Sequence, residues 1–173
     1  KQEENALTTK YDKLIAGAEI EWEGDILNLS LMRPYLTSSD RSVRKKAYEK
    51  YSAFFASVAD ELDEIYDKLM KNRTEQAKQI GYENYVELGY YRMNRNCYDK
   101  TMVDNYRRQI KEYFVPFAEK MHERRRKRLG LDKLSYIDAG VYFRNGNPAP
   151  VGNPEEIIKE GRRMYEEMSP ETK

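Results

Sequence analysis

The feature that most constrains the fold is a stripe of apolar residues with helical spacing, which starts at Val43 and ends at Leu69. Its members are three or four residues apart throughout: Val43, Ala47, Tyr51, Phe54, Val58, Leu62, Ile65 and Leu69. An average spacing of about 3.7 residues keeps the stripe on one side of a nearly straight helix. Because capping residues precede the stripe and Gly81 follows it, we predict one long helix over residues 39–80.

A β-hairpin is predicted near the N-terminus, over residues 19–29. Ile20 and Trp22 alternate with acidic residues, Gly24 and Asp25 supply a turn, and the alternation then resumes. An isolated hairpin is only marginally stable in water. We therefore expect this hairpin to pack on a helix, or on a sheet that lies partly outside the chain.

The rest of the chain shows helical periodicity interrupted by turn signals. The predicted segments are a short helix that ends near Gly89 and then a turn (82–95), a long helix kinked at Pro116 (99–129), a loop (131–152) and a last helix with an asparagine cap (153–168). We expect a single region over residues 1–173. The predicted fold class is mainly α, with long antiparallel amphipathic helices and a small β-hairpin near the N-terminus.

Charge and cysteine content argue against several classes of partner. The net charge is only +1, from 31 basic and 30 acidic residues, so a dedicated nucleic-acid or anionic-membrane binder is not expected. No apolar run is long enough to cross a bilayer. Cys97 is the single cysteine, which leaves no intramolecular disulfide and fits a reducing compartment. We expect a cytoplasmic protein that binds neither nucleic acid nor membrane.

The only histidine, His122, begins a sequence that falls short of a zinc-peptidase motif. In H-E-x-x-H, two histidines one helical turn apart bind zinc and the glutamate activates water. Here the second ligand position is Arg126, whose guanidinium stays charged and would repel a metal. We therefore predict no catalytic residue and no metal ligand within this chain.

One turn between helices is rich in rings and cations, and it is the best candidate for ligand contact. The candidate substrate-binding residues are Tyr90, Tyr91, Arg92, Asn94 and Arg95. Tyrosine hydroxyls and arginine forks can bind a peptide backbone or its terminal carboxylate. The alternative is that these side chains form a polar lock between helices.

The order of several short segments resembles the oligoendopeptidase F family of zinc metallopeptidases, which are related to thimet oligopeptidase. The resemblance covers essentially the whole chain, and its motifs belong to the scaffold. It rests on residues 11–16, 19–29, 34–36, 41–48, 62–66, 81–85, 88–95, 128–132 and 169–172.

The resemblance implies a largely helical enzyme whose deep channel admits short peptides. In that family zinc is held by an H-E-x-x-H helix and a downstream glutamate, all C-terminal to the region matched here. The chain would then be an internal fragment, from the N-terminal to middle part of the catalytic fold, that forms part of the channel scaffold and is inactive without the remainder of the parent polypeptide. The alternative is a stand-alone helical protein-interaction module without enzymatic activity.

Overall fold

The computed structural model describes residues 1–172 and is mainly helical, with one two-stranded antiparallel sheet, which confirms the predicted fold class. Its elements are α1 (Gln2–Ala16), β1 (Ile20–Trp22), β2 (Asp25–Leu27), α2 (Arg33–Leu36), α3 (Arg41–Ser57), α4 (Ala59–Gln79), α5 (Tyr85–Arg92), α6 (Lys100–Gln109), the π-helical turn η1 (Ile110–Phe114), α7 (Val115–Leu129), the 3₁₀ turn η2 (Tyr136–Asp138), α8 (Pro154–Met168) and the 3₁₀ turn η3 (Pro170–Thr172).

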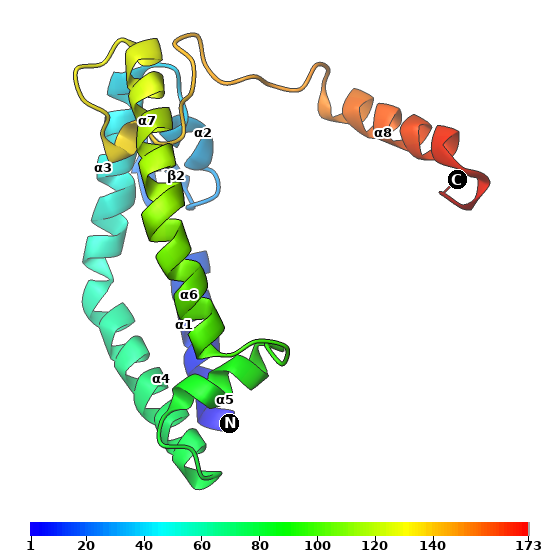
Figure 1. Cartoon of the computed structure of the whole chain (residues 1–173). Coiled ribbons are helices and arrows are strands. Elements are labelled where there is room, and N and C mark those ends of the chain that lie inside the picture. Colours follow the sequence, from blue (N-terminus) through cyan, green and yellow to red (C-terminus); the bar gives the residue numbers. More distant parts are fainter. Residues whose placement is uncertain (173) are drawn as a thin grey trace.

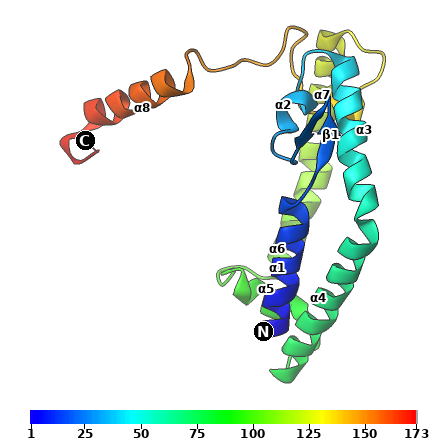
Figure 2. The same ribbon diagram turned by 180° about the vertical axis from the view of Figure 1, so that it is seen from behind.

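The helices form an elongated stalk from which α8 projects (Figures 1 and 2). The chain descends the stalk through α3 and α4 and returns through α6, η1 and α7, so these two long helical segments are antiparallel. The N-terminal helix α1 packs along α4, and α5 lies across the end of the stalk where α4 ends. Among the described residues, no helix is long and apolar enough to span a membrane.

The small core lies where the hairpin meets α2 and α3. Ile20 and Trp22 face inward from β1 and pack with Met32 and Ala47, all of them buried. The ring of Trp22 lies 4.7 Å from that of Tyr35 on α2. The helices thus supply the apolar surface that a two-stranded hairpin lacks on its own.

The helix predicted over residues 39–80 is divided in two at Val58. Its φ of −110° and ψ of 8° end α3, and α4 starts at the next residue. The Ser57 hydroxyl donates a hydrogen bond to the Phe54 carbonyl at 2.7 Å, and such side-chain to backbone bonds bend helices. The apolar periodicity continues through the break, which explains why the spacing alone predicted one helix.

Instead of a kink at Pro116, the helix contains the π-helical turn η1 just before that residue. Proline has no N–H to donate and its ring collides with the carbonyl one turn earlier. The Val115 N–H donates to the Ile110 carbonyl, five residues back, so the turn before the proline is widened. Consequently α6 and α7 continue as one rod (Figure 1).

Two elements differ from the sequence expectation near the ends of α4. No element was predicted for residues 1–18, which contain α1. The short helix α5 does not end near Gly89 but continues to Arg92. Gly89 is buried inside it, and a Cβ there would lie 3.2 Å from the ring of Tyr85. The glycine therefore allows a close ring contact and does not end the helix.

Candidate functional site

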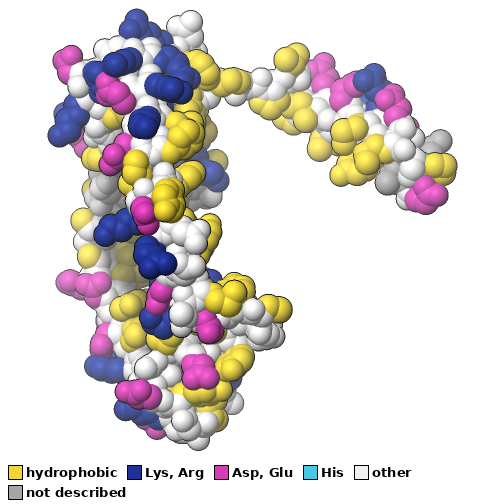
Figure 3. Space-filling model, in the orientation of Figure 1, with side chains coloured by type: hydrophobic (Ala, Val, Ile, Leu, Met, Phe, Trp, Pro, Cys, Tyr) yellow, Lys and Arg dark blue, Asp and Glu magenta, His cyan; other side chains and the backbone are white. Residues whose placement is uncertain are grey.

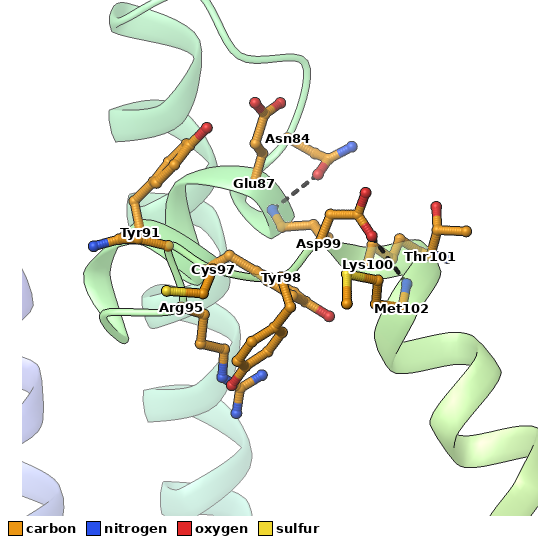
Figure 4. Close-up of a pocket in the computed structure, with 13 residues that line it drawn as sticks. Asn84, Glu87, Tyr91, Arg95, Cys97, Tyr98, Asp99, Lys100, Thr101 and Met102 are labelled. Carbon is orange, nitrogen blue, oxygen red and sulfur yellow. Dashed lines mark hydrogen bonds between the residues drawn. The ribbon is translucent and has the colours of Figure 1, made fainter.

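A pocket of about 650 Å³ lies between α5 and the start of α6, and we call it the α5–α6 pocket (Figure 4). Three of the five predicted binding residues, Tyr90, Tyr91 and Arg95, line it. The other lining residues are Asn84, Val86, Glu87, Asn96, Cys97, Tyr98, Asp99, Lys100, Thr101 and Met102.

Hydrogen bonds at the end of α5 fix the backbone of this pocket. The Arg95 N–H donates to the Tyr90 carbonyl at 2.9 Å, and the Asn94 N–H to the Tyr91 carbonyl at 3.0 Å. Asn94 has a φ of 57°, so it occupies the left-handed region. Together these features form a Schellman motif, in which asparagine is the favoured residue after glycine. Asn94 therefore shapes the turn and does not line the pocket.

The next helix is fixed just as firmly. The Asp99 carboxylate accepts a hydrogen bond from the Met102 N–H at 2.9 Å and caps the N-terminus of α6 (Figure 4). The connection between α5 and α6 is thus held at both ends, which limits how far the pocket can deform.

Arg95 is the half-buried cation of the pocket. Its guanidinium carbon lies 5.3 Å from the centroid of the Tyr90 ring. The rings of Tyr90 and Tyr98 meet edge to face, 6.5 Å apart. Within residues 1–172 the Arg95 side chain forms no ion pair and no hydrogen bond. Its donors are therefore available to a ligand.

Arg92 points elsewhere, into a cluster that we call the Glu4 lock. Its Nη1 lies 3.0 Å from Glu4 Oε1, and Arg73 Nε donates to the same carboxylate at 2.9 Å. Gln76 donates to the other oxygen at 3.1 Å. Burial would raise the pKa of Glu4, but hydrogen bonds from Arg92, Arg73 and Gln76 lower it to about 2. Arg92 thus joins α5 to α1 and α4.

A second buried carboxylate, Asp138, was not singled out from the sequence. It accepts hydrogen bonds from Arg41 at 2.9 and 3.0 Å, from Arg44 Nη2 at 2.9 Å and from the Ser135 N–H at 3.0 Å. This cluster anchors the loop after α7 to the start of α3. The available signals were the capping-box spacing of Ser135 and Asp138 and the one-turn spacing of Arg41 and Arg44.

The near-motif at His122 has a structural explanation. Glu123 accepts two hydrogen bonds from Arg126, at 2.7 and 2.8 Å, so the position of the second zinc ligand holds the glutamate's ion-pair partner. His122 itself is exposed on α7. In the described part of the chain, no group of three or more metal-binding side chains comes together. These residues do not fit a zinc ion.

Comparison with known proteins places this geometry in a family. The sequence profile of Peptidase family M3 matches residues 35–149. A provisionally named oligoendopeptidase F from Bacillus anthracis is 44% identical over 99% of the chain, with a TM-score of 0.92. PZ peptidase A, solved with an inhibitor, is 46% identical over 99% of the chain, with a TM-score of 0.94. No curated protein matches the chain.

A further solved structure, also provisionally named oligoendopeptidase F, is 46% identical over 99% of the chain, with a TM-score of 0.94. The chain spans 30–31% of the length of these solved structures. The profile match covers most of the sequence, and the likeness extends over nearly all of the structure. The chain therefore belongs to peptidase family M3, and its resemblance to oligoendopeptidase F is confirmed.

Proposed function

We propose that the chain forms part of the channel scaffold of a cytoplasmic zinc metalloendopeptidase that hydrolyses short peptides. The observation that carries this proposal is the likeness to oligoendopeptidases at 44–46% identity across 99% of the chain. Family membership favours this function over a stand-alone helical interaction module. Because the chain spans less than a third of those structures, the activity belongs to the whole parent polypeptide.

The surface of the stalk supports a scaffold role. Large apolar side chains are exposed along the rod of α6, η1 and α7 and again on α8, and they form yellow patches in Figure 3. They are Met102, Tyr106, Tyr113, Phe114, Val115, Phe117, Met121, Ile157, Ile158, Met164, Tyr165 and Met168. Extended apolar surface of this kind marks interaction sites. We assign the remainder of the parent polypeptide as the partner that covers it.

Zinc in the parent enzyme would supply Lewis-acid chemistry, by polarising a carbonyl and lowering the pKa of a water molecule. We propose that this chain contributes no ligand to that ion; in support, Glu123 is paired with Arg126, and no group of three or more metal-binding side chains comes together among residues 1–172. The zinc ligands therefore come from the remainder of the polypeptide. The part of this chain in the reaction is to hold and orient peptide.

The first test measures zinc content and cleavage of a quenched fluorescent peptide. Full-length protein should contain stoichiometric zinc and cleave the peptide, with loss of activity on chelation. The 173-residue chain should do neither. Glu123→Gln in the full-length protein is a matched probe of the near-motif, and it should retain zinc and activity. Stoichiometric zinc in the chain alone would contradict the proposal, as would joint loss of zinc and activity in Glu123→Gln.

A second test addresses the substrate class. We expect peptides of increasing length to be cleaved by the full-length enzyme only up to a limit, and an unfolded protein chain to resist cleavage. A rate that does not depend on length would contradict a closed channel. The measurement is kcat/KM for a series that shares one cleavage sequence and differs only in flanking residues.

A further inference from the structure

We propose that Arg95, together with Tyr90 and Tyr98, forms a subsite that binds a carboxylate of the peptide. This inference rests on the proposed peptidase function and names the chemical group that the α5–α6 pocket recognises. The carboxylate can be the C-terminus of a peptide or an acidic side chain, and the experiments below separate these two sources.

The contacts of Arg95 among the described residues leave its N–H donors free for such a ligand. A guanidinium that stacks on an aromatic ring uses its face, whereas its N–H groups lie in its plane. The Arg95 guanidinium is 5.3 Å from the Tyr90 ring centroid and has no carboxylate or carbonyl acceptor among the described residues. Two parallel N–H groups match the two oxygens of a carboxylate. The side chain thus offers a bidentate donor inside a pocket.

The subsite is organised before any ligand arrives. The Schellman motif fixes the backbone of Arg95, and the ring of Tyr90 restricts its side chain. The ring of Tyr98 meets the ring of Tyr90 edge to face, with 6.5 Å between the ring centroids. Ordering a long flexible side chain opposes binding, and here folding has already met much of that cost.

Several other cations among the described residues are already paired. Arg92, Arg41 and Arg44 already bind buried carboxylates. Lys100 lines the pocket but pairs with Asp104. Arg95 is therefore the cation of the pocket whose bonding capacity the described residues leave unused.

The net charge of the pocket does not explain a preference for carboxylate ligands, because acidic side chains also line the pocket. Glu87 and Asp99 offset Arg95 and Lys100. Binding must therefore depend on the directed fork of Arg95. For this reason Arg95→Lys, which keeps the charge and removes the fork, should not restore binding.

The test compares matched peptides in the full-length enzyme. One peptide carries a free C-terminus and the other a C-terminal amide, and a second pair contrasts an internal glutamate with glutamine. Arg95→Ala should raise KM for one carboxylate peptide by about 10- to 100-fold, the loss expected for a charge-assisted hydrogen bond. KM for the matched peptide without that carboxylate (the amide or the glutamine peptide) should change less than threefold. The pair that shows the difference identifies the source of the carboxylate.

Arg124→Ala is the matched control, since it removes an exposed guanidinium from α7 outside the pocket. It should leave both KM values unchanged. Equal effects of Arg95→Ala on acid and amide peptides would overturn the subsite. A fall in melting temperature with no selectivity would show instead that Arg95 binds the remainder of the polypeptide. If Arg95→Lys kept the full preference for carboxylate peptides, bidentate binding by the Arg95 guanidinium would also be contradicted.

Failure of the proposed function has a different signature. If the wild-type enzyme cleaves neither peptide, the peptidase proposal is wrong, and the subsite is still tested by binding. Fluorescence anisotropy of labelled acid and amide peptides should show tighter binding of the acid to wild-type protein. That preference should disappear in Arg95→Ala. No preference in the wild-type protein would refute the subsite directly.

Discussion

Replacing Asp138 by asparagine tests whether a buried carboxylate holds the loop after α7 against α3. The Asp138 side chain is fully buried and accepts hydrogen bonds from Arg41, Arg44 and the Ser135 N–H. Burial would raise its pKa, but these hydrogen bonds lower the pKa from 3.8 to about 2. At about 1.4 kcal/mol per pH unit, the charged form stabilises the fold by about 2.5 kcal/mol.

The substitution also leaves a guanidinium without its counter-charge. The Arg44 side chain is only 4% exposed, whereas the Arg41 side chain is 47% exposed and can turn to water. Breaking a buried ion pair costs about 3–5 kcal/mol, and the asparagine oxygen retains one acceptor. We therefore expect Asp138→Asn to lower the free energy of unfolding by about 3 kcal/mol.

Urea unfolding monitored by Trp22 fluorescence is the appropriate assay. Trp22 is the only tryptophan and is buried in the core beside α3. With a urea dependence of about 2 kcal/mol/M, the midpoint should fall by about 1.5 M. Asp132→Asn is the matched control, because it removes the same charge from an exposed position nearby and should change stability by less than about 0.5 kcal/mol.

The pH dependence gives a second readout of the same interaction. Since folding lowers the pKa of Asp138, its contribution is complete above the unfolded value of 3.8 and is lost as the pH falls toward about 2. The difference in stability between wild-type protein and Asp138→Asn should therefore shrink between about pH 5 and pH 2. A midpoint shift no larger than that of Asp132→Asn, or one independent of pH, would refute the reasoning.

Three further predictions concern helix ends and the other buried carboxylate. Glu4→Gln should destabilise the packing of α1 on α4 and α5 by about 2 kcal/mol at pH 7. The effect should become smaller toward pH 2, because the pKa of Glu4 in the folded protein is about 2. Hydrogen exchange of the α1 amides measures both effects. Asn94→Gly should leave the free energy of unfolding nearly unchanged, whereas Asn94→Val should lower it by about 1–2 kcal/mol because Asn94 has a φ of 57°. Melting temperatures distinguish the two variants. Gly130→Ala should lower the free energy of unfolding by about 1–2 kcal/mol. The reason is that Gly130 has a φ of 69° and that the new Cβ would lie 2.1 Å from the Arg144 guanidinium. The contrasting substitution Gly161→Ala, inside α8 with open space around it, should raise the helix content measured by circular dichroism.

The five predicted binding residues show how far local sequence signals reach. Rings and cations in a turn indicated a site, and the pocket includes Tyr90, Tyr91 and Arg95. The same pattern could not distinguish Arg95 from Arg92, because both are arginines close to the end of one short helix. Their roles differ because Arg92 meets the Glu4 carboxylate near the N-terminus, whereas within residues 1–172 Arg95 meets none.

By itself, the sequence determined the mainly helical fold class with its small hairpin, and the family. These features depend on spacing and capping within a few residues, which the chain carries locally. Only the tertiary structure decided that the long stripe breaks at Val58 and that Glu4 and Asp138 meet arginines 69 or more residues away. Such ion pairs form because packed helices bring distant segments together, and no local spacing encodes them. The same packing gives the Arg95 side chain no ion pair and no hydrogen bond among the described residues, and that made it the candidate for ligand binding.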